Sequence, residues 1–374
     1  MAYKIYSYKI LWRNTMIIQF VFDGISRVPC GGHKIIFEYA NRLTQRGYHV
    51  RILFNIEEVG KKRFHFLPLS WRFLLARLAV SYYPKWFSLS EKVKKVSIHS
   101  ITDTEVPDAD IVVATAVETA EPVFHLSRTK GNKLYLIQGY ETWNGWTDEM
   151  VQDTYRLSMK NIVITQWLQK KVLETGAECV LIPNSLDFKV FYVENSIDKR
   201  NPYTISMLYH EGEHKGSIYG IQALKRLKKK YSKMEAILFG VPRRPKNLPP
   251  WIQYVHRANQ EQLRNIYNHS AVYLCPSIAE GFGLTGAEAM ACGCAYVASD
   301  YGGVHEYAEE GRNVLLSMPK DVNGLVDHIS YLFDHNNQRI QLAEQGHQDI
   351  QKLNWDKSVD LFEQVIRENI AEKV

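Results

Sequence analysis

The sequence predicts an α/β protein built from two doubly wound parallel-sheet domains. Short apolar runs alternate with amphipathic stretches along most of the 374 residues. The runs are rich in Val, Ile and Leu and are apolar on both faces, as in parallel strands that helices cover on either side. The pattern stops at the polar stretch 193–203 and then starts again. Because a chain of this length usually forms more than one domain, we expect one domain on each side of that stretch.

The expected elements follow this pattern in order. In the first half the expected strands are 17–22, 48–54, 109–115, 133–138, 161–165 and 179–183. A helix should follow the first strand, because apolar residues recur at helical spacing between Ile35 and Leu43 and Gly47 can end it. In the second half the expected strands are 204–209, 235–240, 252–255, 271–276, 295–299 and 313–317, and the expected helices are 217–231, 260–268, 284–292 and 322–334.

The domain borders follow from this order. We place the first domain at residues 1–190, the second at 191–353, and a closing amphipathic helix at 354–374. Ligands of doubly wound sheets bind outside the carboxyl ends of the strands, so functional residues are expected in the loops that follow the strands.

Basic residues are concentrated in one segment. Residues 61–95 hold nine lysines and arginines against one acid, Glu91, which more than accounts for the formal net charge of +6. A local patch points to a surface partner, whereas a general excess would suggest non-specific polyanion binding, so we expect no nucleic-acid partner. Within the segment, 71–87 has apolar residues at helical spacing, namely Trp71, Leu74, Leu75, Leu78 and Tyr82. Such a helix suits an anionic membrane surface; an ordinary core helix with charged flanks is the alternative.

Three features bear on the compartment. The chain lacks the long apolar stretch that a membrane-spanning helix needs, and its first 24 residues show no signal-peptide cleavage pattern. Its five cysteines are odd in number and form no Cys-x-x-Cys pair, as in a cytosolic protein with reduced thiols. We therefore expect a cytoplasmic protein that is peripheral on the inner face of the membrane.

The stretch PSIAEGFGLTGAEAMACG, residues 276–293, is the strongest indication of chemistry. A predicted strand ends at its start, and a predicted helix begins near Leu284. The first backbone N–H groups of a helix have no partner within it and carry partial positive charge, which suits a diphosphate. The residues expected to hold the diphosphate are Gly281, Phe282, Gly283, Leu284 and Thr285.

Two carboxylates flank this loop, Glu280 before it and Glu288 about one turn into the helix. A carboxylate accepts two hydrogen bonds side by side, the geometry that adjacent hydroxyls of a ribose or hexose offer. A diphosphate between two sugars describes a nucleotide-sugar. The alternative is a strand–helix corner in which the glycines serve packing and Glu288 is an exposed helix charge.

Several segments together resemble retaining glycosyltransferases of family 4, the glycosyl transferases group 1. They cover most of the chain: GGHKIIFEYANRLTQRGYHV, IPNSLDFKVF, YHEGEHKG, EGFGLTGAEAMACG and SDYGGVHEYAEEGRNVLL. The resemblance implies a GT-B fold, in which two Rossmann-like domains face each other across a cleft. It makes the first domain the acceptor side and the second the nucleotide-sugar side, and it implies that the closing helix crosses back to the first domain.

The resemblance also implies roles for single residues. Glu280 is expected to contact the donor sugar and to act in catalysis, Glu288 to hold the ribose, and Lys215 to hold the diphosphate. Gly31 and Gly32 correspond to glycines that lie at the cleft, opposite the phosphates.

One position departs from the family pattern. Members usually carry an arginine five or six residues before the lysine of the Lys-Gly pair, where this chain has Tyr209 and His210. His210 is therefore the candidate phosphate ligand in this region. An imidazole holds phosphate best when it is protonated, so donor affinity should fall as the pH rises from about 6 to 8.

These observations lead us to expect a retaining hexosyltransferase. It would move a hexose-type sugar from a nucleotide-sugar to a lipid-linked or cell-surface glycan, of the polysaccharide, capsule or lipopolysaccharide type. The resemblance implies chemistry without a metal, and no cofactor is expected because the nucleotide-sugar is a co-substrate. Glycosidase chemistry by the paired carboxylates would leave the phosphate cradle unexplained. A nucleotide-sugar-binding protein that has lost catalysis, or a sugar-nucleotide epimerase of similar fold, remains an alternative.

Overall fold

The computed structural model describes residues 15–57, 68–143 and 145–371, which fall into two compact units. The first unit runs up to Ile182 and resumes at Asp356, and the second extends from Pro183 to Trp355. The units thus divide at 182/183 and 355/356, against the 190/191 and 353/354 placed from the sequence.

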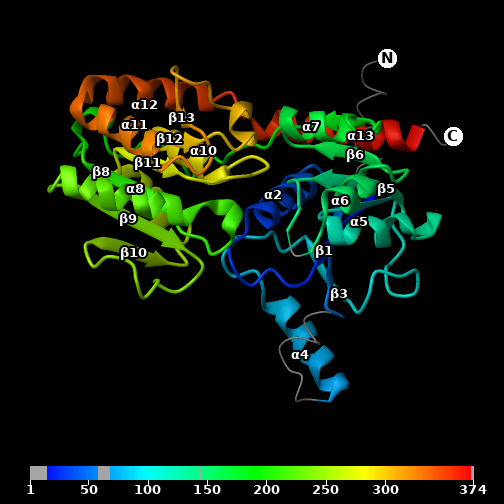
Figure 1. The fold of residues 1–374 in the computed structure, drawn as a ribbon. Coiled ribbons are helices and arrows are strands. Elements are labelled where there is room, and N and C mark those ends of the chain that lie inside the picture. The colour runs from blue at the N-terminus through cyan, green and yellow to red at the C-terminus, as the bar shows by residue number, and fades with distance from the viewer. Residues whose placement is uncertain (1–14, 58–67, 144, 372–374) are drawn as a thin grey trace. The chain divides into compact units, whose positions relative to one another are not determined.

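A parallel sheet of seven described strands organises the first unit, in the order β3-β2-β1-β4-β5-β6-β7 (Figure 1). The strands are β1 (Ile17–Asp23), β2 (His49–Asn55), β3 (Lys94–Ile98), β4 (Ile111–Ala114), β5 (Asn132–Ile137), β6 (Lys160–Val163) and β7 (Cys179–Leu181). The helices described in this unit are α2 (Gly31–Gln45), α4 (Leu69–Tyr82), α5 (Val117–Phe124), α6 (Asp148–Tyr155), α7 (Gln166–Leu173) and α13 (Trp355–Ala371). The sequence pattern predicts all of these strands except β3.

The second unit has a six-stranded parallel sheet in the order β10-β9-β8-β11-β12-β13. The strands are β8 (Thr204–Leu208), β9 (Glu235–Gly240), β10 (Ile252–His256), β11 (Val272–Cys275), β12 (Ala295–Ser299) and β13 (Leu315–Ser317). The helices are α8 (Ser217–Lys230), α9 (Gln260–His269), α10 (Leu284–Ala291), α11 (Val322–Asp334) and α12 (Asn336–Ile350). The predicted α/β class, with a doubly wound parallel sheet in each unit, is confirmed.

The core of each unit lies along its central strands. Every residue of β4 and of β11 is buried, because helices cover both faces of the sheet, and neither strand carries a charged residue. Several of the covering helices are amphipathic. In α8, for example, Ala223, Leu224 and Leu227 are buried, whereas the lysines of its last turn are on the polar side.

The closing helix α13 packs within the first unit. The ring of Phe362 lies 4.9 Å from Tyr39 of α2 and 6.1 Å from Phe20 of β1, measured between centroids. Arg46, at the end of α2, pairs with Asp360 and lies 3.3 Å from the buried carboxylate of Glu363. Although it is the last helix in the chain, α13 therefore covers the central strands of the first unit.

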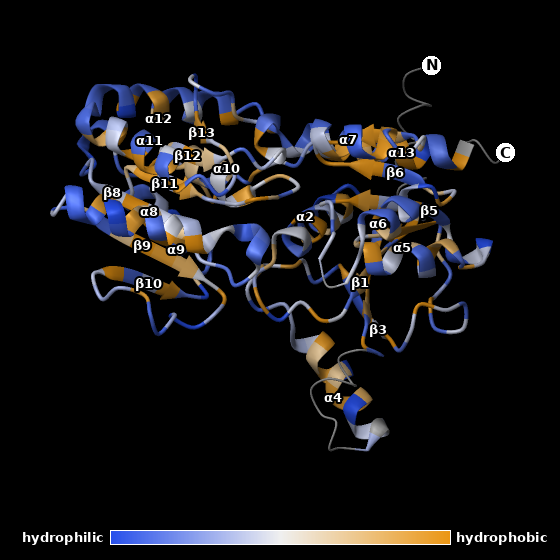
Figure 2. Cartoon of the chain, in the orientation of Figure 1, coloured by the Kyte–Doolittle hydropathy of each residue, from blue (hydrophilic) through white to orange (hydrophobic). Residues whose placement is uncertain are grey.

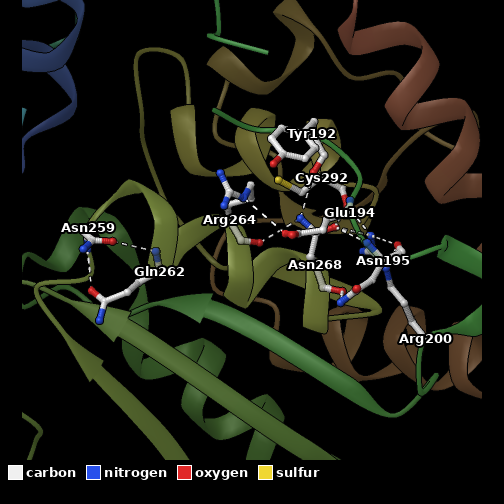
Figure 3. A network of polar contacts seen from close by, with 9 residues as sticks. All are labelled: Tyr192, Glu194, Asn195, Arg200, Asn259, Gln262, Arg264, Asn268 and Cys292. Atoms are coloured by element: carbon white, nitrogen blue, oxygen red, sulfur yellow. Dashed lines mark hydrogen bonds and ion pairs between the residues drawn. The ribbon is translucent and has the colours of Figure 1, made fainter. Parts of the chain in front are cut away.

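A buried arginine fixes the segment that opens the second unit (Figure 3). The guanidinium of Arg200 donates to the carbonyl oxygens of Asn195, Ser270 and Gly293 at 2.9, 3.0 and 2.9 Å. The side-chain oxygen of Asn268 accepts from the same guanidinium and from the backbone N–H of Asn195. Because the carbonyl dipoles satisfy its donors, a charged group that is 6% exposed is tolerated here. The polar stretch that separates the two sequence patterns is thus an ordered part of the second unit.

Candidate active site

The strand order of the second unit has a switch point between β8 and β11. From β8 the sheet continues to β9 and β10 on one side, and on the other side it continues from β11 to β12 and β13. The loops at the carboxyl ends of β8 and β11 therefore leave in opposite directions, which is where doubly wound sheets bind ligands. Lys215 follows β8 and Glu280 follows β11, so the strand order alone brings these two predicted residues to one place.

Backbone contacts join these two loops. The N–H of Ile278 donates to the carbonyl oxygen of His214 over 2.7 Å. Gly216 lies directly before α8 with φ +59°, and a Cβ at this position would lie 1.9 Å from the carbonyl oxygen of Pro276. Only glycine combines this left-handed conformation with so close an approach of two backbones. The two loops therefore form one connected edge of the site.

Lys215 and Glu280 are in direct contact. The Nζ atom of Lys215 lies 3.1 Å from Oε2 of Glu280. The other carboxylate oxygen accepts a hydrogen bond from the hydroxyl of Ser277, and the Glu280 side chain is 8% exposed. A cation and a hydroxyl thus fix the orientation of a nearly buried carboxylate. The sequence predicts both residues at the donor site but not that they pair with each other.

The helix that follows Glu280 begins as the sequence predicts. Gly283 is the N-cap of α10, in the left-handed conformation with φ +83° and ψ +53°. Among the described residues, no backbone acceptor outside α10 is found for the N–H groups of 282–285, as expected for the first turn of a helix. The side chain of Phe282 is buried, with its ring 5.0 Å from that of Tyr307, so Phe282 can offer an anion only its backbone N–H.

Glu288 lies inside the unit. It is 3% exposed, and its Oε2 atom accepts a hydrogen bond from the hydroxyl of Tyr267 over 3.2 Å. The alternative in which Glu288 is an exposed helix charge is therefore wrong, because a surface charge would be surrounded by water. A carboxylate at this depth needs hydrogen-bond donors, and Tyr267 supplies one of them.

Gly31 and Gly32 belong to the first unit. They form the first turn of α2, directly after the loop that leaves β1. That loop lies at the switch point of the first sheet, between β1 and β4. A Cβ at Gly32 would lie 3.4 Å from the amide nitrogen of Gln138, which follows β5. In each unit, these predicted site residues thus lie near the switch point of the sheet.

The side chain of His210 makes a hydrogen bond within its own loop. Its Nδ1 atom accepts a hydrogen bond from the N–H of Gly212 over 2.9 Å, so Nδ1 carries no proton. Burial, and next the positive charge of Lys215, lower the pKa of His210 below its usual value of 6.5. Protonation would break the bond to Gly212. The expectation that protonated His210 holds phosphate between pH 6 and 8 therefore does not fit the free protein.

We now expect the affinity for an intact nucleotide-sugar to change less than twofold between pH 7 and 8. A lowered pKa leaves His210 neutral across that range, so any gain from a charged imidazole would arise only at lower pH. The His210→Asn variant, which keeps an acceptor for Gly212, should give the same profile. Isothermal titration at four pH values checks this. A wild-type affinity that falls severalfold over this range, with a flat profile in the variant, would show that His210 is charged in the complex.

The Asp-x-Asp pair of this chain lies in the first unit, whereas Lys215 and Glu280 lie in the second. Asp108 and Asp110 form an Asp-x-Asp pair, but they precede β4 and so lie at the amino edge of the first sheet. Asp108 pairs with Lys130 over 2.8 Å, and Asp110 accepts from the N–H of Ile17 over 2.7 Å. Within the described ranges, no group of three or more His, Cys, Asp or Glu residues is arranged to hold a metal ion.

Residues 193–349 match the family model of glycosyl transferases group 1. This range holds all six strands of the second sheet together with Lys215, Glu280 and Glu288. The match to glycosyl transferases group 1 thus lies in the second unit. An uncharacterized glycosyltransferase of Methanocaldococcus jannaschii is 24% identical to this chain over 230 residues, which is 49% of this chain and 64% of that one. That relative is thus matched over less than two thirds of its length.

Two further likenesses extend over most of the chain. The phosphatidyl-myo-inositol mannosyltransferase of Mycobacterium tuberculosis is 22% identical over 371 residues, with 92% of this chain and 93% of that one covered. The Anabaena protein HepE, crystallised with UDP-glucose, superposes with a TM-score of 0.69 at 16% identity, covering 96% of this chain and all of that one. The fold is GT-B.

Sequence reasoning misses several groups that build the candidate site. Ser277 and the carbonyl of His214 hold Glu280 and its loop, and three tyrosines lie behind the glycines that follow. Ser277 is three residues before Glu280 in the quoted stretch, so its spacing offers a weak signal. The tyrosines are distant in sequence and give none.

Proposed function

We propose that this protein is a retaining hexosyltransferase that uses a nucleotide-sugar as donor. The observation that carries the proposal is the contact of Lys215 with Glu280 beside the open first turn of α10, at the switch point of the second sheet. A cation and backbone N–H groups suit a diphosphate, and carboxylates on either side suit the hydroxyls of two sugars. The family match and the likeness to a protein crystallised with UDP-glucose support it.

The proposed reaction replaces one bond at the anomeric carbon by another on the same face of the sugar. The bond from this carbon to the diphosphate oxygen breaks, and its electron pair leaves with the diphosphate. An acceptor hydroxyl oxygen forms the new bond, and its proton goes to the departing diphosphate oxygen. Lys215 and the N–H groups of 282–285 meet the negative charge on the leaving group without a metal. Glu280 stabilises the positive charge that develops on the sugar ring.

A direct test separates this proposal from its alternatives. The protein is screened for thermal stabilisation by nucleotide-sugars, since a ligand at 100 times its Kd stabilises by about 2.7 kcal/mol. Stabilising donors are then assayed for transfer and for hydrolysis, with the product identified. Binding without turnover would favour a nucleotide-sugar-binding protein, and an isomerised sugar nucleotide would favour an epimerase. Absence of any stabilising donor would contradict the proposed site.

For the acceptor, we propose a lipid-linked or cell-surface glycan that is reached at an anionic membrane surface, with α4 as the contact. Figure 2 shows α4 largely in the colours of apolar residues. Ala76 and Val80 of this helix are buried, yet Trp71, Leu74, Leu78 and Tyr82 on the opposite side are 59, 49, 59 and 56% exposed. A helix that is apolar on all sides is normally covered on all sides. Because an ordinary core helix would bury these four side chains, their exposure favours the membrane-surface interpretation of α4.

The charges around α4 favour anionic lipid as the partner. Arg77 and Lys85 are exposed, and the ammonium of Lys85 lies 3.7 Å from the centre of the Tyr82 ring, next to the apolar face. Lys95 does not contribute, because its ammonium donates to the carbonyl oxygens of Ser81 and Tyr83 at the end of the helix. Lys61, Lys62 and Arg63 lie outside the described residues. No described helix is long and apolar enough to cross a membrane, so the proposed contact is peripheral, on the cytoplasmic face.

Binding to vesicles with 30% anionic lipid should be at least tenfold tighter than binding to zwitterionic vesicles, because each basic residue near the surface contributes about 1 kcal/mol. The Trp71→Ala/Leu78→Ala variant should lose most of this binding, and 0.5 M salt should weaken it. Leu173→Ala is the matched control, since Leu173 is 53% exposed on another helix of the same unit. Co-sedimentation measures the binding of the wild type to both vesicle types, the effect of salt, and the binding of the double variant and the control variant. Equal binding to both vesicle types would contradict a membrane partner. So would a wild-type dimer that becomes monomeric in the double variant, because the apolar face would then be a dimer interface.

A further inference from the structure

Three tyrosine hydroxyls meet behind the loop that carries the proposed diphosphate site. They come from Tyr296 in β12, Tyr301 in the loop after β12, and Tyr307 after the short helical turn Gly303–Glu306. The hydroxyl oxygens of Tyr296 and Tyr301 lie 2.8 Å apart, those of Tyr301 and Tyr307 lie 2.7 Å apart, and those of Tyr296 and Tyr307 lie 3.5 Å apart. The three side chains are at most 8% exposed. They form a buried hydrogen-bonded group with its two shortest contacts in series, which we name the tyrosine row.

The glycines of the loop are shaped to this row. A Cβ at Gly283 would lie 2.1 Å from the hydroxyl oxygen of Tyr301, and one at Gly286 would lie 2.3 Å from that of Tyr296. No side chain fits in either place without moving a buried ring. The first turn of α10 is therefore in direct contact with the hydroxyls, and its two glycines are required by them.

The row ends on the backbone of the loop. The hydroxyl of Tyr307 donates to the carbonyl oxygen of Gly283 over 2.9 Å. With that direction fixed, Tyr307 can accept from Tyr301, and Tyr301 from Tyr296, so that each hydroxyl donates toward Gly283. Burial raises the pKa of each phenol above its usual value of 10, so all three keep their protons at neutral pH. Hydrogen bonds in such a series polarise one another.

We propose that the tyrosine row positions and polarises the peptide group between Gly283 and Leu284, so that its N–H binds the diphosphate of the donor. This peptide carries the carbonyl that Tyr307 holds at one end and the N–H that opens α10 at the other. The N–H groups of Gly286 and Ala287 also donate to this carbonyl, at 3.0 and 3.3 Å, so Tyr307 adds a third donor that holds the peptide against turning over. It also draws electron density from the amide nitrogen, which makes the N–H a stronger donor. The inference rests on the proposed function, and it makes Tyr307 a positioning residue for the diphosphate.

The test compares ligands with and without phosphates. The nucleoside diphosphate that most stabilises the wild type, from ADP, GDP, UDP, CDP and dTDP, is titrated into wild type and Tyr307→Phe, and the matching nucleoside is measured by competition. Tyr307→Phe should weaken diphosphate binding roughly five- to tenfold and leave nucleoside binding within twofold. Tyr301→Phe, which interrupts the row one step further back, should show a smaller loss with the same selectivity.

The control is Tyr231→Phe. Tyr231 is in the same unit and its hydroxyl bonds to Asp334 over 2.9 Å, but it lies at the end of α8, outside the loop. It should leave both ligands unchanged. Equal weakening of nucleoside and diphosphate in Tyr307→Phe would indicate a general packing role and would overturn the inference. Unchanged diphosphate binding in Tyr307→Phe would overturn it while leaving the proposed function standing. A wild type that binds none of the five diphosphates would overturn both.

Discussion

Replacing Glu280 with glutamine should lower kcat at least a hundredfold, which corresponds to about 2.7 kcal/mol of transition-state stabilisation. The substitution keeps the size of the side chain and its place beside Ser277 but removes the charge that opposes the cation developing on the sugar ring. It also releases Lys215 from its ion pair. Because the ammonium is then free to interact with the diphosphate alone, the KM for the donor should stay within about threefold. Steady-state kinetics with the identified donor measures both constants.

Glu288→Gln is the matched variant, since it removes the charge of a second buried carboxylate, which lies in the helix α10 that follows the loop of Glu280. We propose that Glu288 holds the ribose, a part of the donor that the reaction does not change. Its loss should therefore raise the donor KM with kcat less affected. If Glu280→Gln kept a near-normal kcat while Glu288→Gln lost it, the roles of the two carboxylates would be reversed.

The strands of the two sheets can be predicted because most are buried on both faces. A run such as VVA in β4 or VYLC in β11 has few other uses in a soluble chain. β3 is missed because its sequence is KKVSI and it lies at the edge of the sheet, where only Ile98 is buried. Helix α12 is missed because it is polar over most of its length and its N-cap residue, His335, supplies no side-chain cap.

The candidate site, like the fold, can be predicted from the sequence only in part. The positions of Lys215 and Glu280 after their strands follow from local pattern, and the strand order brings them together. Their 3.1 Å contact depends on how two loops pack, which neither loop encodes alone. The burial that lowers the pKa of His210 and its hydrogen bond from the N–H of Gly212 appear only when the backbone conformation is known. Sequence thus identifies the residues of the site more readily than their partners and charge states.

The junction of the two loops leads to the largest expected effect on stability, which concerns Gly216. Gly216→Ala should destabilise the second unit by about 3 kcal/mol or more and lower its apparent Tm by roughly 8 °C. An L-residue in the left-handed region costs about 1–2 kcal/mol, and here the new Cβ would also meet the Pro276 carbonyl oxygen at 1.9 Å. The Cβ position is fixed by the backbone of Gly216, and the carbonyl oxygen belongs to the backbone of Pro276. The clash can therefore be relieved only if the loops after β8 and β11 separate. That separation would carry Lys215 away from Glu280 and weaken donor binding as well.

Gly311→Ala isolates the conformational part of this cost. Gly311 is in the same unit and has φ +73°, but nothing lies within 4 Å of a Cβ built there. Its replacement should therefore cost only about 1–2 kcal/mol, with donor affinity unchanged. The difference between the two variants, measured by thermal unfolding with and without donor, is the contribution of the close approach at Pro276. If Gly216→Ala were no more destabilising than Gly311→Ala and bound donor normally, the loops could separate without cost, and their junction would not be what holds Lys215 against Glu280.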